Sequence, residues 1–283
     1  MSREQWQTKL LICAGLTAAF LLTLQAAHAQ DYRVRLPGQL IQQTYSLGSA
    51  PFVKVDGFIG GISIIGDGGS QVQLAATKII RAQSQDLAQR AQREVHLDLS
   101  HTGDSLDVYV DGPFRHHYWH NPGYRVTFDI TLHVPGNARV NLKTLDGGIR
   151  MANLDGGFRV ATVNGRVEAQ QLAGAGEAHT VNGAVRAGFT AAPSGNCTFA
   201  TVNGSVHVTF PPGLNAVLHY QTVNGGVYTD FKTAPMASPA PESVEGGMRV
   251  FRPRSAGTAQ VGRGGPVITL KTVNGGIYIH RGR

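Results

Sequence analysis

A histidine-rich segment around residue 118 is the most unusual cluster of chemically active side chains in the chain. Its three imidazoles could ligate Zn²⁺ or Cu²⁺, and its tyrosine and tryptophan could stack on sugar rings. No carboxylate or cysteine lies at ligand spacing inside the segment, so we predict no bound metal and no cofactor. Gly112-Pro113 and Asn121-Pro122-Gly123 bracket it, which is typical of a surface loop, and a loop without any ligand is the alternative. The segment comprises His116, His117, Tyr118, Trp119 and His120.

A second set of candidates follows a repeated tetrapeptide, Thr-Val-Asn-Gly, and its two looser copies. If equivalent residues stack, the third residue after each tetrapeptide falls in one column on one face. Arg150, Glu168 and Arg186 would then form an ion-pair ladder, which the other members extend. Such a column could be a polar and aromatic platform for a glycan or a protein partner. The alternative is an ordinary solvated face, on which each exposed pair contributes about 0–1 kcal/mol. The candidate binding residues are Arg150, Glu168, Arg186, His207, Tyr228 and Tyr278.

Carboxylates in the repeat region are the candidates for acid–base catalysis. They are Asp146, Asp155, Glu168 and Glu177. In a coil with two sides, a step of nine residues places consecutive carboxylates on opposite sides, where they cannot share a substrate. The sequence has no Ser-His-Asp order, phosphate-binding loop or metal-binding helix. We therefore predict that the chain is not an enzyme. A polysaccharide-active β-helix enzyme is the alternative, and it would require carboxylates from adjacent coils to meet.

The repeat itself must position these side chains. Its threonines at 144, 162 and 180 are 18 residues apart, and those at 180, 201 and 222 are 21 apart. Weaker turn signals lie between them, so each unit holds two short strands and two corners. Apolar residues alternate within each strand, as in Phe158-Arg159-Val160, which points one face inward. The predicted corner residues are Asp146, Asp155, Asn164, Gly165, Asn182, Gly183, Asn203, Gly204, Asn224, Gly225, Asn274 and Gly275.

Two architectures compete for this pattern. Asn-Gly between alternating apolar residues is a strong hairpin signal, which favours an antiparallel meander. In a β-solenoid each unit is instead one coil, and equivalent residues stack about 4.8 Å apart. A meander needs no identity between successive turns, whereas a solenoid favours it because identical side chains form ladders. We therefore predict an all-β solenoid of 18–21-residue coils with a threonine ladder and an asparagine ladder.

The repeated Thr-Val-Asn-Gly-Xaa-Val corners follow a β-rich segment and a signal peptide. In this the chain resembles the bacterial putative-adhesin families of unknown function, from about Phe52 to its end. The resemblance implies β-strand repeats and a solenoid-like fold. It implies no catalytic residues, because none are defined for those families.

The chain divides into four predicted parts. Residues 1–29 form a signal peptide and 30–44 an extended lead-in. Residues 45–140 form a β-rich cap with one short helix over 84–93, which Ser84 can cap at its N-terminus. Residues 141–283 form the repeats, interrupted by a loop insertion at 232–265.

The N-terminal segment predicts export. Arg3 and Lys9 precede an apolar stretch from Leu10 to Leu24, and Ala27-His28-Ala29 provides small residues at a cleavage site. An uncleaved anchor is the alternative, although the stretch is short for a membrane span. We predict no transmembrane segment after cleavage. The mature chain would hold one cysteine, Cys197, and so no internal disulfide.

These features predict an exported, non-catalytic, adhesin-like binding or structural protein of the cell envelope. It would be periplasmic, surface-bound or secreted. The formal net charge of +7 favours anionic surfaces, although solubility explains it equally well. Predicted partners are a cell-surface glycan or an envelope protein, and not nucleic acid. A regulatory accessory of the envelope is a further alternative.

Overall fold

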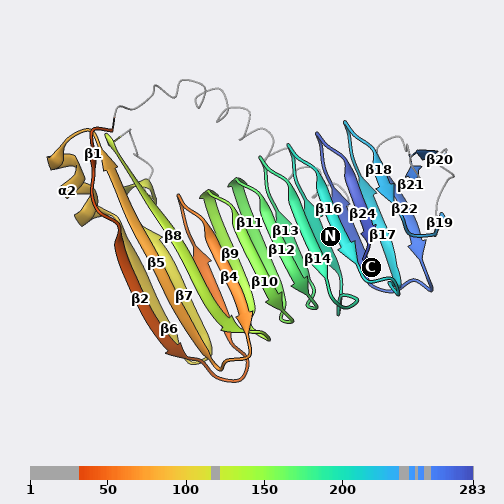
Figure 1. Ribbon diagram of the computed structural model, residues 1–283, viewed down its shortest axis with the longest axis horizontal. Coiled ribbons are helices and arrows are strands. Elements are labelled where there is room, and N and C mark those ends of the chain that lie inside the picture. Colours follow the sequence, from red (N-terminus) through yellow and green to blue (C-terminus); the bar gives the residue numbers. More distant parts are fainter. Residues whose placement is uncertain (1–31, 116–121, 236–241, 246–247, 252–255, 283) are drawn as a thin grey trace.

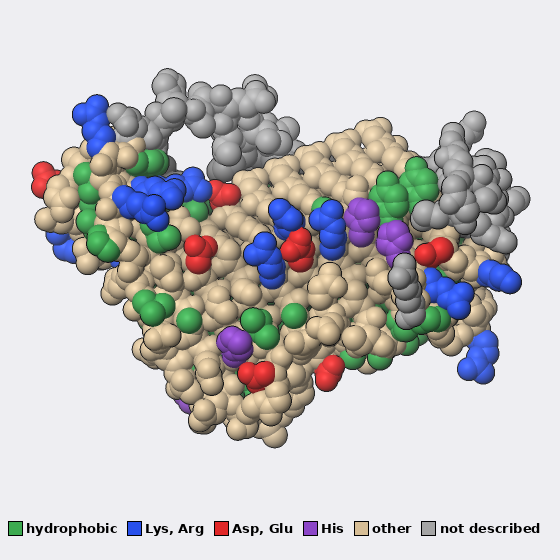
Figure 2. All heavy atoms as spheres, viewed as in Figure 1, with side chains coloured by type: hydrophobic (Ala, Val, Ile, Leu, Met, Phe, Trp, Pro, Cys, Tyr) green, Lys and Arg blue, Asp and Glu red, His purple; other side chains and the backbone are tan. Residues whose placement is uncertain are grey.

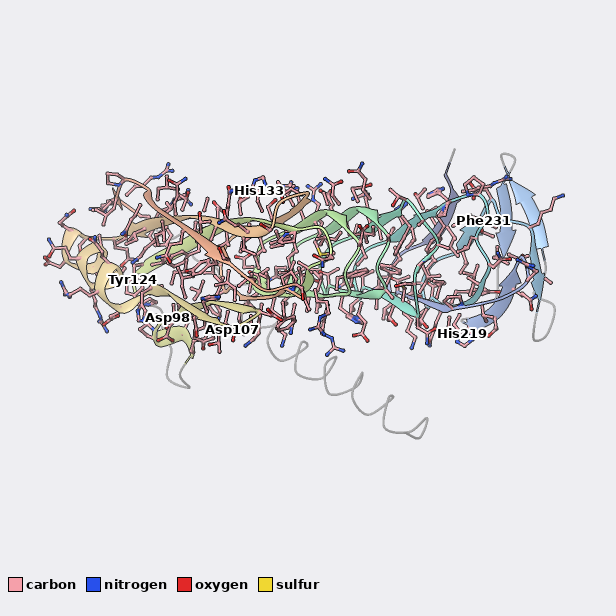
Figure 3. All side chains as sticks on the ribbon, turned by 90° about the horizontal axis from the view of Figure 1, so that it is seen from below. Asp98, Asp107, Tyr124, His133, His219 and Phe231 are labelled. Carbon is pink, nitrogen blue, oxygen red and sulfur yellow. The ribbon has the colours of Figure 1, made fainter. Side chains whose placement is uncertain are left out.

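Two large β-sheets make up almost all of the structure. The computed structural model describes residues 32–115, 122–235, 242–245, 248–251 and 256–282. Both sheets run along an elongated body (Figure 1), and a view from below shows them as two layers that face each other (Figure 3). Within the described residues there is one α-helix, α2 (Gln85–Glu94), and one short 3-10 helix, η1 (Pro113–Arg115). The prediction of an all-β fold with one short helix is confirmed.

Sheet I has 13 strands, in the order β1-β5-β8-β4-β10-β12-β14-β16-β24-β18-β21-β20, and β2 also pairs with β5. Its strands are β1 (Val34–Arg35), β2 (Gln39–Ser46), β4 (Ile62–Asp67), β5 (Gln71–Ala82), β8 (Tyr124–Pro135), β10 (Ile149–Leu154), β12 (Val167–Leu172), β14 (Val185–Phe189), β16 (Val206–Phe210), β18 (Val227–Thr229), β20 (Glu242–Glu245), β21 (Met248–Phe251) and β24 (Ile277–Arg281).

Sheet II has 11 strands, in the order β19-β22-β17-β23-β15-β13-β11-β9-β3-β7-β6. Its strands are β3 (Phe52–Asp56), β6 (His96–Thr102), β7 (Ser105–Asp111), β9 (Arg139–Asp146), β11 (Phe158–Asn164), β13 (Gly176–His179), β15 (Cys197–Ala200), β17 (Ala216–Gln221), β19 (Thr233–Pro235), β22 (Ala256–Val261) and β23 (Val267–Lys271).

The repeat region alternates between the two sheets. β11 lies in sheet II and β12 in sheet I, so the Asn-Gly pair between them turns a corner and does not close a hairpin. From β9 to β16, each strand pairs in parallel with its equivalent in the next unit, as Ile149 does with Val167 and Val167 with Val185. Apolar residues at alternate positions point inward and join one core, while their neighbours face outward. The period of the sequence therefore sets the register of both sheets.

Hydrogen bonds link successive Thr-Val-Asn-Gly corners. Each threonine is buried, and its hydroxyl donates to a glycine carbonyl of the neighbouring corner, as Thr201 Oγ1 does to Gly183 O at 2.8 Å. The asparagine amides form a second ladder along the outside. In each bond the side-chain Nδ2 of one asparagine donates to the Oδ1 of its neighbour. The bonds run from Asn182 to Asn164 (2.9 Å), Asn203 to Asn182 (2.8 Å), Asn274 to Asn203 (2.7 Å) and Asn224 to Asn274 (2.7 Å).

The last two strands occupy an unexpected place. They come last among the repeats of the chain, but β23 lies between β15 and β17, and β24 between β16 and β18. The corner containing Asn274 therefore separates the corners of Asn203 and Asn224, although it comes last in the chain. All of these corners share one tetrapeptide, so the sequence alone does not determine which of them become neighbours.

The segment 232–265 also differs from the expected loop. It contributes β19 and β22 to sheet II, and β20 and β21 to sheet I. β22 pairs antiparallel with β17, and β21 pairs antiparallel with β18, so both cover the last parallel strand of a sheet. Its proline-, alanine- and serine-rich stretch concealed these strands from sequence reasoning. At the other end, the predicted extended lead-in (30–44) holds β1 and most of β2, which pair with β5.

The helix follows its capping signals. Ser84 Oγ accepts a hydrogen bond from the Leu87 amide at 3.3 Å, Asp86 lies in the first turn and Arg93 in the last. Ala88 and Ala91 are buried. The predicted span, 84–93, thus differs from the observed helix by one residue at each end.

Replacing Asn203 with proline should destabilise the fold strongly. The Asn203 amide donates to Val181 O at 2.7 Å, and its side chain bonds both adjacent asparagines. Proline removes all three bonds, so we expect the free energy of unfolding to fall by about 3 kcal/mol or more in urea denaturation. Asn203→Ala keeps the backbone donor and should cost less. Unchanged melting of the proline variant would mean that this corner does not support the stack.

Candidate functional site

Six sequence-predicted binding residues stand side by side across sheet I. Successive strand pairings place them in register, with Tyr278 of β24 between His207 of β16 and Tyr228 of β18. A line of basic, acidic, histidine and apolar side chains crosses this face in Figure 2. We call these residues the outer row, which in spatial order is Arg150, Glu168, Arg186, His207, Tyr278 and Tyr228.

The charged half of the outer row is centred on one carboxylate. Arg150 Nε lies 3.2 Å from Glu168 Oε2, and Arg166 Nη1 lies 3.2 Å from Glu168 Oε1. Arg166 thus takes the place that we had expected for Arg186 in the ion-pair ladder. The Arg150 side chain is 70% exposed and that of Glu168 only 25%. Two guanidinium groups therefore hold a single, partly covered carboxylate. Arg186 lies one strand further along the outer row, so the surface here carries excess positive charge.

The pKa of Glu168 reflects two opposed effects. Partial burial raises this pKa, but hydrogen bonds from Arg150 and Arg166 outweigh the burial and hold it below the ordinary value of 4.5. The carboxylate consequently stays ionised in mildly acidic solution, where it keeps both arginines in place.

The aromatic half of the outer row is a stack of rings. The centroids of His207 and Tyr278 are 4.5 Å apart with their planes at 8°, and those of Tyr278 and Tyr228 are 4.9 Å apart at 9°. Each ring faces its neighbour, so the middle ring presents an edge to solvent and has no face free for a sugar. This differs from the flat platform suggested by the sequence. The polar groups of the stack are two phenol hydroxyls and an imidazole, which can form hydrogen bonds.

Two glycines make room for the tyrosines. A Cβ atom at Gly226 would lie 2.7 Å from Tyr228 Oη, and one at Gly276 would lie 2.7 Å from Tyr278 Cε2. Both tyrosine side chains thus lean over a glycine two residues before them in the same chain. Sequence reasoning missed these positions, although the pattern Asn-Gly-Gly-Xaa-Tyr at both corners carries the signal.

Burial lowers the pKa of His207, and the nearby Arg186 and His280 lower it further. Its ring is therefore neutral at pH 7, and it both donates and accepts hydrogen bonds.

A shallow hollow lies at the Arg150 end of the outer row. Its volume is about 200 Å³, and Ser63 of β4, Thr131 of β8 and Arg150 of β10 line part of it. The hollow exists because the two positions that continue the outer row beyond Arg150 carry short side chains. Asp129 also lines it and accepts a hydrogen bond from the Gly61 amide at 3.0 Å. Sequence reasoning missed this hollow because its walls come from three distant segments.

The other candidates are either outside the described residues or spread over different elements. His116, His117, Tyr118, Trp119 and His120 lie outside the described residues. Asp146 ends β9 and forms an ion pair with Arg125, while Asp155 is an exposed corner residue. Glu168 lies in sheet I and Glu177 in sheet II, paired with Arg159. Glu168 and Glu177, nine residues apart, therefore lie in different sheets.

The pH dependence of protein stability tests the environment of Glu168. Because its folded-state pKa is lowered, the unfolded chain takes up the proton first as the pH falls. The stabilisation from this carboxylate is thus complete above about pH 4.5 and disappears as the pH falls through the folded-state pKa. We expect urea denaturation of wild type and Glu168→Gln to show a stability difference at pH 7 that disappears in acid. A difference independent of pH would contradict the assignment.

No protein-family model and no curated protein matches the chain. Solved structures do resemble it. A putative cell adhesion protein from Clostridium sporogenes is 10% identical with a TM-score of 0.41, and covers 86% of this chain and 100% of its own. A putative adhesin from Bacteroides fragilis is 12% identical with a TM-score of 0.39, and the match covers 86% of this chain and 97% of that protein. A putative lipid binding protein from Parabacteroides distasonis is 11% identical with a TM-score of 0.25, and the match covers 87% of this chain and 97% of that protein.

Two of these three neighbours carry the adhesin description that the repeated corners predicted. With TM-scores below 0.5, the likenesses carry no argument about activity or ligand. Among the described residues, no helix is both long enough and apolar enough to span a membrane.

Proposed function

We propose that the chain is a non-catalytic, adhesin-like binding protein of the bacterial cell envelope, and that its outer row binds an acidic glycan. The observation that carries the proposal is the register of sheet I. That register sets the six side chains of the outer row one strand apart in a single line. Neighbouring strands lie about 4.8 Å apart, so an extended polymer laid across them meets a new side chain at every strand.

The composition of the outer row favours a polymer that carries both negative charge and hydroxyl groups. Arginine forms paired hydrogen bonds with carboxylate, sulfate or phosphate oxygens. Arg150, Arg166 and Arg186 provide three such groups against one carboxylate. The stacked rings next to them supply neutral donors and acceptors that suit sugar hydroxyls. The hollow beside Arg150 provides space for a substituent at one end.

The architecture that we propose for this surface is a β-solenoid over residues 141–283, with residues 45–140 as its cap. The parallel pairing of successive units and the threonine and asparagine ladders support it. A rigid stack would hold the outer row in place without a ligand, which reduces the entropy lost on binding. Export after removal of residues 1–29 is part of the same proposal, and it rests on the sequence of that segment.

A non-catalytic role is favoured over a polysaccharide-active enzyme by the placement of the acids. Glu168 is the one carboxylate of the outer row, and two arginines hold it ionised, so it is poorly suited to donate a proton. Glu177, the next candidate along the chain, lies in the other sheet.

A glycan array with matched acidic and neutral members tests the proposal. We expect wild type to bind acidic members selectively, and Tyr228→Phe/Tyr278→Phe to bind more weakly because it lacks the two hydroxyls. A Tyr118→Ala/Trp119→Ala variant should bind as wild type does. If only the Tyr118→Ala/Trp119→Ala variant lost binding, recognition would lie in the histidine-rich segment and not in the outer row. Absence of binding to any glycan by wild type would overturn the proposal.

A further inference from the structure

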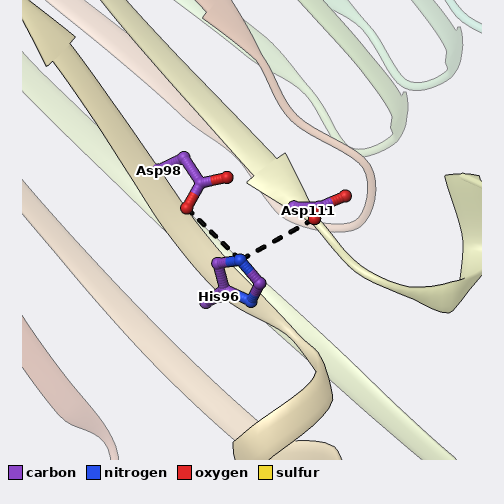
Figure 4. Close-up of side chains that lie close together, drawn as sticks. All are labelled: His96, Asp98 and Asp111. Atoms are coloured by element: carbon purple, nitrogen blue, oxygen red, sulfur yellow. Dashed lines mark ion pairs between the residues drawn. The ribbon is translucent and has the colours of Figure 1, made fainter.

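At the far end of sheet II from the repeats, three side chains with metal-binding atoms meet on one exposed face. β6 and β7 pair antiparallel, and their register sets His96 directly opposite Asp111. Asp98 follows two residues after His96 on β6, so its side chain points to the same face. All three converge on a single point above the two strands (Figure 4).

The distances suit a small transition-metal ion. His96 Nε2 lies 3.3 Å from Asp98 Oδ1 and 3.7 Å from Asp111 Oδ2. All three ligand atoms lie within 4.8 Å of one another. Zinc binds imidazole nitrogen and carboxylate oxygen at about 2.0–2.2 Å in a tetrahedron, whose ligand atoms are then roughly 3.3–3.6 Å apart. The two distances from His96 Nε2 are close to this spacing.

The charges around this point favour a cation. Within the described residues, the ion pairs that Asp98 and Asp111 form are with the same imidazole nitrogen. Two carboxylates that converge on one point repel each other unless a positive charge lies between them. One imidazole and two carboxylates form a ligand set suited to zinc more than to magnesium or calcium, which prefer oxygen alone.

We propose that His96, Asp98 and Asp111 form a Zn²⁺ site that ties the edge strand β6 to β7 and leaves one coordination position open. The His96 and Asp98 side chains are 52% and 53% exposed, so an ion can enter from solvent and the open position faces outward. This site is separate from the outer row, because β6 and β7 belong to sheet II.

Isothermal titration of the full chain with ZnCl₂ tests this site. We expect one high-affinity site whose Kd rises about tenfold or more in His96→Ala and in the nearly isosteric Asp111→Asn. The triple variant His116→Ala/His117→Ala/His120→Ala should keep wild-type affinity. Thermal melting without metal checks that each variant is folded, and added Zn²⁺ should raise the Tm of wild type but not of Asp111→Asn.

Two outcomes would overturn the proposal. One is the absence of a Zn²⁺ site in the folded wild type. The other is binding that survives His96→Ala and Asp111→Asn but is lost in the triple variant, which would move the site to the histidine-rich segment.

Discussion

Replacing Gly275 with alanine is expected to destabilise the fold strongly. A Cβ atom at this position would lie 2.0 Å from the carbonyl oxygen of Gly204, which is backbone and cannot move aside without shifting a neighbouring corner. Gly275 also has a φ of +155°, which residues with a side chain rarely adopt. We expect the free energy of unfolding, measured in urea, to fall by about 3 kcal/mol or more.

Gly213 provides the matched control. It lies in a turn where an added Cβ would meet nothing within 4 Å, so Gly213→Ala should change stability by no more than about 0.5 kcal/mol. Equal effects of the two substitutions would mean that the corners are not packed as closely as the structure has them. The effect at Gly275 should be large because its corner lies between those of Asn203 and Asn224.

Reversing two charges of the outer row is expected to abolish recognition of an acidic glycan. Each charge-assisted hydrogen bond contributes about 1.5–3 kcal/mol. The double variant Arg150→Glu/Arg186→Glu loses two such bonds and gains repulsion in their place. Its affinity for the glycan should therefore be at least about 100-fold weaker than that of wild type. Binding can be measured by surface plasmon resonance on an immobilised acidic glycan identified by the array.

The control for this pair carries the same change in net charge on the other sheet. Arg139 and Arg159 belong to β9 and β11 of sheet II, and both are exposed. Arg139→Glu/Arg159→Glu should therefore change affinity only slightly, through long-range electrostatics that salt screens. Equal losses in both double variants would indicate attraction to net charge alone, without a site on sheet I.

The sequence predicted those features that depend on the period of the repeat. Because Arg150, Glu168 and Arg186 are 18 residues apart, they share one position in successive units, and the structure places them in register. The helix was predictable because Ser84 and Asp86 are strong local signals at its start.

Other features depend on contacts that a repeat does not encode. The insertion of β23 and β24 into the stack could not be predicted, since the corner at Asn274 matches those at Asn203 and Asn224 in sequence. The on-edge stacking of the tyrosines depends on how each ring packs over Gly226 or Gly276, which periodicity does not specify. The hollow beside Arg150 requires Ser63 and Thr131 to meet it from distant strands.

The location of a bound glycan tests the central claim most directly. Two-dimensional amide NMR of the labelled chain, titrated with an acidic glycan selected on the array, reports which residues the ligand approaches. We predict shift changes that follow the outer row from Arg150 to Tyr228, with little change on sheet II. Changes confined to sheet II, to the histidine-rich segment or to scattered basic residues would contradict the assignment of this surface.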